Sequence, residues 1–293
     1  MDQAQQLRNI IKRGEQPRPA ARVITVTSGK GGVGKSNVSI NLAVQLKKLG
    51  KRVIIFDADF GLANIEVMFG AVPKHNLSDL IYQGKSIREI ITMGPMEIGF
   101  ISGGSGIAGL SNLGRDYINY LVRNLAELDS ISDVIIIDTG AGISDAVLEF
   151  LVASGEILLV MTPEPTSLTD SYSLLKALSR HPMYNREMTA VKVIANKVSG
   201  PEEGRQIFGK LSAVVSRYLK MPLQYLGYVP EDPQLMKAIM QQTPISIENP
   251  KAKSSLAFEN IANSLTGKEP VAAYTRHGMA GFFANMVRGK KFS

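Results

Sequence analysis

Short apolar segments alternate with longer amphipathic segments along most of the chain. Strand-like runs occur at 23–27, 52–57, 97–101, 133–138, 156–161, 190–195 and 225–229. Helix-like segments begin after residue 36 and then occupy 115–127, 144–152, 166–179, 203–219, 233–241 and 252–265. Strands that alternate with helices in this way predict a parallel sheet with helices on both faces. The pattern therefore predicts an α/β fold with a mostly parallel, twisted sheet.

The length of the chain limits its domain organisation. Its 293 residues are enough for one large α/β domain with a full core, and nothing in the pattern requires a second. We expect this domain to span 22–268, with an N-terminal extension at 1–21 and a separate segment at 269–293. Within the extension, an amphipathic stretch at 2–12 precedes a proline-containing linker, which predicts a short helix that orders when it docks. A frayed tail is the alternative.

The C-terminal segment has the pattern of an amphipathic helix. Its large apolar residues, at i, i+3, i+4, i+7 and i+8, are Met279, Phe282, Phe283, Met286 and Val287. Arg288, Lys290 and Lys291 stand beside or after this stripe, and no Asp or Glu occurs between 270 and 293. Such a helix can lie among lipid headgroups, where each basic residue adds about 1 kcal/mol of attraction to an anionic leaflet. The alternative is a helix docked on the body of the protein, and both states can exist in turn.

Composition restricts which cellular compartment and which kinds of partner we expect. The chain is 44% hydrophobic and 20% charged, as globular proteins are, and no apolar run is long enough to span a bilayer. Its first residues are polar where a signal peptide would be apolar, so we expect a cytoplasmic protein. It contains no cysteine, which excludes disulfides and thiolate-held metals or clusters. A formal charge of +7 and a pI near 9.4 favour anionic partners.

Candidate chemistry begins at a glycine-rich loop between the first strand and the first helix. Residues 29–36 read GKGGVGKS, which matches the phosphate-binding pattern G-x-x-x-x-G-K-[ST] in the strand–loop–helix context it requires. The glycines let successive backbone N–H groups face one anion. Lys35 supplies charge for the β- and γ-phosphates, and the Ser36 hydroxyl can bind Mg²⁺. A second lysine, Lys30, exceeds what a phosphate cradle needs, and this predicts a further role for it.

Two predicted strands end in carboxylates, at the edge where parallel sheets bind ligands. Asp138 closes the strand at 133–138 and has the form of a carboxylate that holds Mg²⁺ through water. Asp57 closes the strand at 52–57. Asp59 follows on the next loop, where it can orient or deprotonate a water for attack on the γ-phosphate. The alternative is that Asp57 and Asp59 only cap the following helix.

These segments together resemble the MinD/ParA class of P-loop ATPases. KGGVGKS at 30–36 is similar to its deviant Walker A motif, and DADFGL at 57–62 and DTGAG at 138–142 are similar to its two switch segments. The resemblance implies a Mg²⁺-dependent ATPase that is a monomer with ADP and an ATP-sandwich homodimer with ATP. It gives Lys30 a role across the dimer interface, where it stabilises phosphate charge in the opposite subunit.

The resemblance also implies a set of site residues. The implied catalytic residues are Lys30, Lys35 and Asp59. The implied magnesium ligands are Ser36, Asp57 and Asp138, the last acting through water. The implied contacts with ATP or ADP are Gly29, Lys30, Gly31, Gly32, Val33, Gly34, Lys35, Ser36, Asn37, Asp138, Asn196, Pro230 and Glu231. In that set Asn196 resembles the base-binding asparagine of the class, and Pro230 and Glu231 resemble part of the loop that covers the adenine.

Both ends of the chain resemble those of one branch of this class. DQAQQLR at 2–8 is similar to the N-terminal activator motif of the flagellar subfamily FlhG/YlxH. The resemblance implies that this segment docks as a helix on the signal-recognition-particle-type GTPase FlhF and stimulates its hydrolysis, through Asp2, Gln3, Leu7 and Arg8. It also implies contacts with flagellar C-ring components, control of flagellum number or placement, and reversible binding of the C-terminal stripe to the inner face of the cell membrane after ATP-dependent dimerisation.

Other functions fit parts of the sequence. A MinD-like ATPase of cell-division sites shares the body of the chain, but it does not need the N-terminal extension. A ParA-like DNA-partitioning ATPase would spread positive charge over the folded body, whereas here the uncompensated charge lies on an amphipathic tail, so we expect no nucleic acid. A non-enzymatic adaptor would not need Asp59. Nitrogenase-type iron proteins and iron–sulfur scaffolds need cysteine ligands, which this chain lacks.

Overall fold

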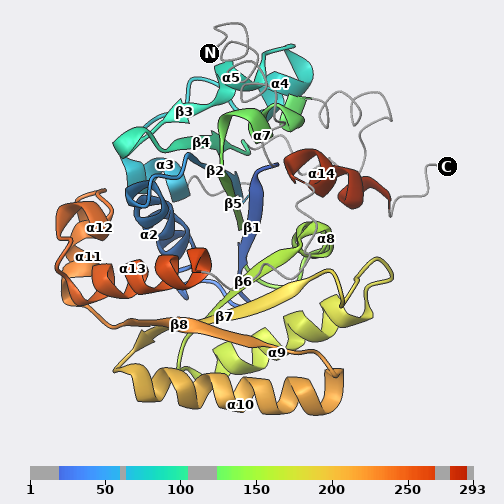
Figure 1. Ribbon diagram of the computed structural model, residues 1–293, viewed down its shortest axis with the longest axis vertical. Helices are drawn as coiled ribbons and strands as arrows, with labels where there is room; N and C mark the ends of the chain where they lie inside the picture. Colours follow the sequence, from blue (N-terminus) through green and yellow to red (C-terminus); the bar gives the residue numbers. More distant parts are fainter. Residues whose placement is uncertain (1–19, 60–63, 105–123, 268–277, 289–293) are drawn as a thin grey trace, which may run out of the picture.

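The core of the protein is a single eight-stranded sheet. The computed structural model describes residues 20–59, 64–104, 124–267 and 278–288. Within these ranges the strand order is β3-β4-β2-β5-β1-β6-β7-β8, and every pair is parallel except β3 with β4 (Figure 1). The strands are β1 Arg22–Thr27, β2 Val53–Ala58, β3 Thr92–Met93, β4 Gly99–Ser102, β5 Val134–Thr139, β6 Glu156–Met161, β7 Ala190–Val198 and β8 Gln224–Pro230. The predicted, mostly parallel α/β fold is confirmed.

Helices cover both faces of this sheet. On one face lie α2 (Lys35–Lys48), α3 (Asn64–Phe69), α11 (Pro233–Met240), α12 (Ile245–Glu248) and α13 (Lys253–Thr266). On the other lie α4 (Leu77–Tyr82), α5 (Ile87–Ile90), α7 (Leu128–Ile131), α8 (Asp145–Ala153), α9 (Pro165–Arg180), α10 (Pro201–Leu219) and α14 (Gly278–Arg288). A short 3₁₀ turn, η1 (Pro95–Glu97), precedes β4.

The central strand β5 shows why the four residues 134–137 are all apolar. Val134 and Ile136 belong to the core beneath α2 and α13, whereas Ile135 and Ile137 belong to the core on the opposite face. Alternate side chains of a strand point to opposite faces of the sheet. The part of the strand that is covered on both faces therefore needs apolar residues at successive positions, and the polar residues Asp138 and Thr139 come only at its carboxyl end.

Most predicted elements occur within a few residues of their predicted bounds. The structure adds the antiparallel edge strand β3 and the short helices α3, α4, α5, α7 and α12, which are too short to show a periodic pattern in the sequence. The helix predicted at 115–127 lies largely outside the described residues. The extension at 1–19, with Asp2, Gln3, Leu7 and Arg8, also lies outside them.

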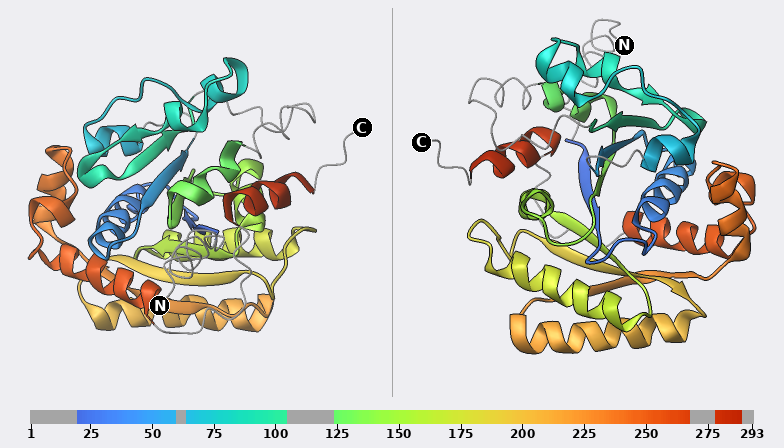
Figure 2. Two further views of the ribbon diagram at one scale, coloured as in Figure 1. Left: turned by 45° about the horizontal axis from the view of Figure 1, so that its top comes forward. Right: turned by 180° about the vertical axis from the view of Figure 1, so that it is seen from behind.

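The C-terminal helix α14 is docked on the body of the protein. The helix lies beside α8 (Figure 2). Its side chains Met279, Phe282, Phe283 and Met286 are buried. The ring of Phe282 stacks on Phe150 of α8, with centroids 6.0 Å apart. The structure thus has the docked arrangement that the sequence left open. The side chain of Val287 and residues 289–293 lie outside the description.

The helix begins with a polar contact to the body. The backbone N–H of Met279 donates a hydrogen bond of 2.8 Å to Oδ1 of Asp129 in α7. An acceptor in this place satisfies one of the N–H groups that every helix leaves unpaired at its start. In the described part of the chain, no helix has both the length and the apolar content to cross a bilayer.

Candidate nucleotide-binding site

The glycine-rich loop lies at the carboxyl end of β1 and leads directly into α2. Gly34 is the N-cap of α2 and has a φ of 90°, in the left-handed region that favours glycine. A side chain at Gly29 would collide with the backbone of Asp170 in α9. Glycine at these two positions lets the loop turn tightly and pack against α9, and the N-terminus of α2 faces the loop as an anion site requires.

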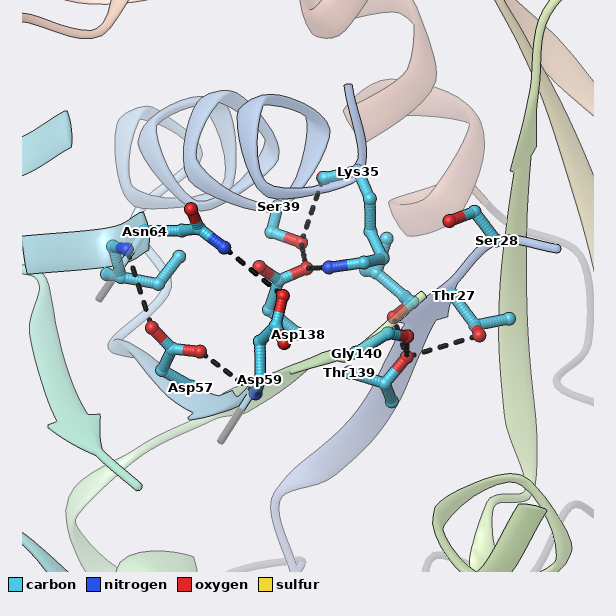
Figure 3. A network of polar contacts seen from close by, with 12 residues as sticks. Thr27, Ser28, Lys35, Ser39, Asp57, Asp59, Asn64, Asp138, Thr139 and Gly140 are labelled. Atoms are coloured by element: carbon cyan, nitrogen blue, oxygen red, sulfur yellow. Dashed lines mark hydrogen bonds and ion pairs between the residues drawn. The ribbon is translucent and has the colours of Figure 1, made fainter. Parts of the chain in front are cut away.

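Lys35, Ser39 and Asp138 form a buried polar cluster next to this loop (Figure 3). The Lys35 ammonium lies 3.1 Å from Oδ1 of Asp138, and the Ser39 hydroxyl donates to the same oxygen at 3.0 Å. Asp138 is completely buried, and its Oδ2 has no hydrogen-bond partner among the described residues. A buried carboxylate oxygen without a partner is costly unless a ligand or water satisfies it.

Asp57 lies beside Asp138 on the neighbouring strand, where the two residues are register partners. Its oxygens accept backbone hydrogen bonds from Asp59 at 3.1 Å and from Ile65 at 3.4 Å. Burial, followed by the charge of Asp138, raises the pKa of Asp57 to about 7. The Asp57 side chain therefore lies beside the cluster of Lys35, Ser39 and Asp138 and also accepts a hydrogen bond from the start of α3. Its role as a magnesium ligand stays a prediction.

Asp59 lies on the loop after β2, close to Gly140 in the segment 138–142. Its Oδ2 accepts a hydrogen bond of 3.2 Å from the Asn64 side chain, and Gly140 lies close enough that a Cβ there would be 3.4 Å from Oδ1. Burial raises the pKa of Asp59, while the charge of Lys35 lowers it and that of Asp138 raises it further. A raised pKa and a fixed orientation suit a group that accepts a proton from water.

The residues present fit a magnesium ion that is shared with phosphate. The candidate donors are the Ser36 hydroxyl and the unpartnered Oδ2 of Asp138, and hard oxygen ligands are what Mg²⁺ prefers. Across the described ranges, no three His, Asp or Glu side chains are grouped so as to hold a metal alone. Mg²⁺ commonly keeps several waters and binds through one or two carboxylates plus substrate phosphates, which matches this donor set.

Lys30 has a partner on its own chain. Its ammonium lies 2.5 Å from Oε2 of Glu164 and 2.9 Å from the Thr166 hydroxyl, at the start of α9. The hydrogen bond and charge of Lys30 lower the pKa of Glu164. The side chain of Lys30 remains 37% exposed, so it is accessible for exchange to another acceptor. Its cross-subunit role is untested by this arrangement and stays a prediction.

The predicted base-binding residues lie together at the ends of β7 and β8. Asn196 is buried and donates from Nδ2 to the Val33 carbonyl at 2.7 Å, while its Oδ1 has no partner among the described residues. The N–H of Glu231 donates to the Val198 carbonyl at 2.8 Å, which keeps the turn after Pro230 beside β7. The free amide oxygen fits an amino group such as that of adenine, although nothing in the described residues tests that contact.

Comparisons with known proteins agree with this geometry. A family profile described as "ParA: NUBPL iron-transfer P-loop NTPase" matches residues 20–266. The chain belongs to the ParA family of P-loop NTPases. It is an ATPase of the MinD/ParA type.

One of two similar relatives of this ParA-family chain carries a flagellar name. It is 39% identical to the antiactivator FleN of Pseudomonas aeruginosa over 91% of this chain and 94% of FleN. It is 34% identical to the flagellum site-determining protein YlxH of Helicobacter pylori over 91% of this chain and 90% of YlxH. The predicted relationship to the flagellar FlhG/YlxH branch is thus confirmed.

Solved structures of the ParA family share the fold. The MinC:MinD cell division complex of Aquifex aeolicus is similar with a TM-score of 0.66 and 24% identity, over 85% of this chain and 97% of that chain. MinD of Pyrococcus horikoshii, solved with Mg-ADP, is similar with a TM-score of 0.64 and 23% identity, over 84% and 96% of the two chains. The profile's description mentions iron transfer, and this chain contains no cysteine, the residue that usually holds iron–sulfur clusters.

Sequence reasoning missed several side chains of this ParA-family site. Ser39 had a readable signal, because it follows Lys35 by four residues on α2 and so shares its helix face. Asn64 lies within five residues of Asp59, but the contact between their side chains is not visible in the pattern. Glu164 and Lys197 come from distant parts of the chain, and only the fold brings them to the loop.

Proposed function

We propose that this ATPase is a homodimerising switch that regulates the number or placement of flagella. The name of YlxH, a flagellum site-determining protein, supports the flagellar role, because this chain matches YlxH over 90% of its length. The monomer would carry ADP and the dimer ATP, so the oligomeric state would depend on which nucleotide is bound.

The chain's own residues account for the hydrolytic step. Lys35, now paired with Asp138, would exchange that partner for the β- and γ-phosphates, and the N-terminus of α2 would hold the same groups. Asp59, held by Asn64, would orient a water in line with the γ-phosphate and accept its proton. A bound Mg²⁺ would neutralise phosphate charge, and Ser36, Asp57 and, through water, Asp138 would hold it.

Lys30 would link hydrolysis to assembly. In the single chain it is bound to Glu164 and Thr166 on the surface of α9. On dimerisation it would leave this pair and stabilise phosphate charge in the partner subunit. The active site would then be complete only in the dimer.

The observation that carries the membrane proposal is the packing of α14 on α8. The N-cap of α8 is Ser144, directly after the switch segment 138–142, and Phe150 of α8 stacks on Phe282 of α14. A shift of the switch segment on ATP binding would move α8 and loosen the docked tail. The released stripe Met279, Phe282, Phe283, Met286 and Val287 would then enter an anionic leaflet, aided by basic residues of the tail.

The N-terminal segment completes the proposal. Its similarity to the FlhG/YlxH activator motif supports stimulation of the GTPase FlhF by residues 1–21, through Asp2, Gln3, Leu7 and Arg8. Flagellar C-ring components are further proposed partners. Removal of residues 1–19 should leave the chain's own ATPase unchanged and abolish stimulation of FlhF, and stimulation that survives would exclude this motif.

The experiment that tests the switch is co-sedimentation with anionic liposomes in ATP or ADP. The full chain should sediment in ATP, remain soluble in ADP, and lose sedimentation when 276–293 are removed. Equal sedimentation in both nucleotides would contradict nucleotide control, and sedimentation without the tail would contradict its role. Parallel titration with double-stranded DNA tests the DNA-partitioning alternative, which predicts salt-sensitive DNA binding by the tailless chain.

A further inference from the structure

Two consecutive side chains at the end of β7 hold two consecutive carbonyls of the phosphate loop. Asn196 Nδ2 donates to the Val33 carbonyl at 2.7 Å. Lys197 Nζ donates to the Gly32 carbonyl at 2.8 Å. Val33 and Gly32 are more than 160 positions away in the sequence from Asn196 and Lys197, so these hydrogen bonds form only in the folded chain. Sequence reasoning assigned a role to Asn196 and none to Lys197.

An unusual backbone conformation at Lys197 allows both side chains to donate hydrogen bonds to the phosphate loop. Consecutive side chains of an extended strand point to opposite faces, so Asn196 and Lys197 would not normally reach the same loop. Lys197 has a φ of 56°, in the left-handed region that a residue with a Cβ rarely adopts. The pairing of β7 with β8 also shifts register between Asn196 and Val198. The irregularity turns the Lys197 side chain towards the loop.

The two carbonyl contacts determine where the loop's N–H groups point. Each peptide unit is planar and trans, so its C=O and N–H point in opposite directions, and no cis peptide occurs in the described ranges. The Gly32 carbonyl shares a peptide unit with the Val33 N–H, and the Val33 carbonyl shares one with the Gly34 N–H. Drawing both carbonyls outwards to β7 turns these two N–H groups inwards, towards the space where phosphate oxygens would lie.

We propose that Lys197 is a positioning residue that preorganises the phosphate loop for nucleotide binding. It acts through the backbone of Gly32 rather than through contact with the reacting atoms. Donors that are already oriented need no reorganisation when the anion arrives, so the anion binds more tightly. The inference rests on the nucleotide site proposed above, and it is independent of dimerisation and membrane binding.

The test is calorimetric titration of the full chain with Mg-ADP, together with steady-state ATPase kinetics. Lys197→Met keeps the aliphatic stem but removes the donor, and it should weaken ADP binding about tenfold and raise KM more than it lowers kcat. Lys197→Arg restores a charged donor and should recover most of the affinity. Lys210→Met, at an exposed lysine on α10, is the matched control and should bind as the wild type does.

A second variant separates positioning from folding. Lys197→Gly removes the donor and also suits the left-handed backbone, so its Tm should equal or exceed that of the wild type while ADP affinity falls. A stabilised protein with weakened binding is not what a merely structural side chain would give. An unchanged affinity in Lys197→Gly and Lys197→Met would overturn the proposal.

Salt concentration separates positioning from simple charge attraction. At about 0.5 M salt the screening length falls to roughly 4 Å. A loss of affinity that persists in Lys197→Met at that salt supports positioning, and one that disappears overturns it. Failure of the wild type itself to bind Mg-ADP would instead contradict the nucleotide site.

Discussion

The Lys30 ammonium lies 2.5 Å from the carboxylate of Glu164, on the same chain. The pair joins the phosphate loop to the first turn of α9, and Thr166 adds a second acceptor at 2.9 Å. In the proposed dimer, Lys30 would have to leave this partner on its own chain to reach the second subunit. Because both side chains are substantially exposed, the pair is screened by solvent and can exchange.

Loss of Glu164 should favour the dimer. Glu164→Gln removes the charge that holds Lys30, so ATP-dependent dimerisation should require a protein concentration a few-fold lower than in the wild type. Analytical ultracentrifugation in ATP measures this shift. Lys30→Ala should bind ATP yet remain monomeric, and an unchanged ATP dimer in that variant would exclude the cross-subunit role. Glu187→Gln, at an exposed glutamate beyond α9, is the charge-matched control.

Asp59 should be needed for hydrolysis but not for binding. Asp59→Ala should release phosphate about 100-fold more slowly, as loss of a general base does, with ATP affinity within a few-fold of the wild type. Asn64→Ala should lower the rate less, because it removes only the 3.2 Å contact that orients the carboxylate. Single-turnover phosphate release measures both rates. A rate for Asp59→Ala equal to that of the wild type would assign the step elsewhere.

The buried pair of Lys35 and Asp138 should show coupled stability. Lys35→Met leaves Asp138 buried without its partner and should lower the free energy of unfolding by about 3 kcal/mol in nucleotide-free protein. Adding Asp138→Asn removes the unpaired charge and should restore most of that loss. Urea unfolding of the two single variants and the double variant gives the coupling energy. If the stability losses of the two single variants simply add in the double variant, the interaction between Lys35 and Asp138 contributes nothing to stability.

Asp57 should make the nucleotide-free protein less stable as pH rises. Its pKa is about 7 in the folded state, above the value of 3.8 for an unperturbed aspartate. The folded state therefore binds more protons between these values, so stability from this group is full below pH 3.8 and is lost as pH rises through 7. The loss is at most about 4 kcal/mol for a shift of this size.

Asp57→Asn should remove that pH dependence. The stability of the variant should differ least from that of the wild type near pH 4.5 and exceed it most near pH 8, in thermal melts without Mg²⁺ or nucleotide. Asp133→Asn is a control of opposite sign, because the hydrogen bond from Arg52 lowers the pKa of Asp133. That variant should lose stability at neutral pH. A constant difference between Asp57→Asn and the wild type across this range would contradict the raised pKa.

Loss of the Asp129 cap should release the C-terminal helix. Asp129→Ala removes the acceptor of the Met279 N–H and should weaken docking by about 1 kcal/mol, which is roughly a fivefold shift towards the free tail. Flotation with anionic liposomes should therefore recover more of this variant without nucleotide. Asp129→Asn keeps an acceptor of similar strength and should behave as the wild type. Equal flotation of all three proteins would show that docking does not limit membrane binding.

The sequence was sufficient to predict those functional features whose residues lie close together in the chain. The phosphate loop, its flanking strand and helix, and the carboxylate Asp138 at a strand end all have short patterns. The apolar stripe of α14 was equally readable, because helical periodicity needs only eleven residues. The surface that the stripe meets was not readable, because Phe56 and Phe150 come from remote elements.

The sequence by itself determined the α/β fold, the nucleotide chemistry and the order of the elements, because these follow from local spacing and side-chain type. Only the tertiary structure decided which groups meet. It placed Glu164 against Lys30, buried Asp57 beside Asp138, and turned Lys197 towards the loop through an irregular backbone. Partner choice and desolvation depend on neighbours more than eighty residues away, and no local pattern encodes them.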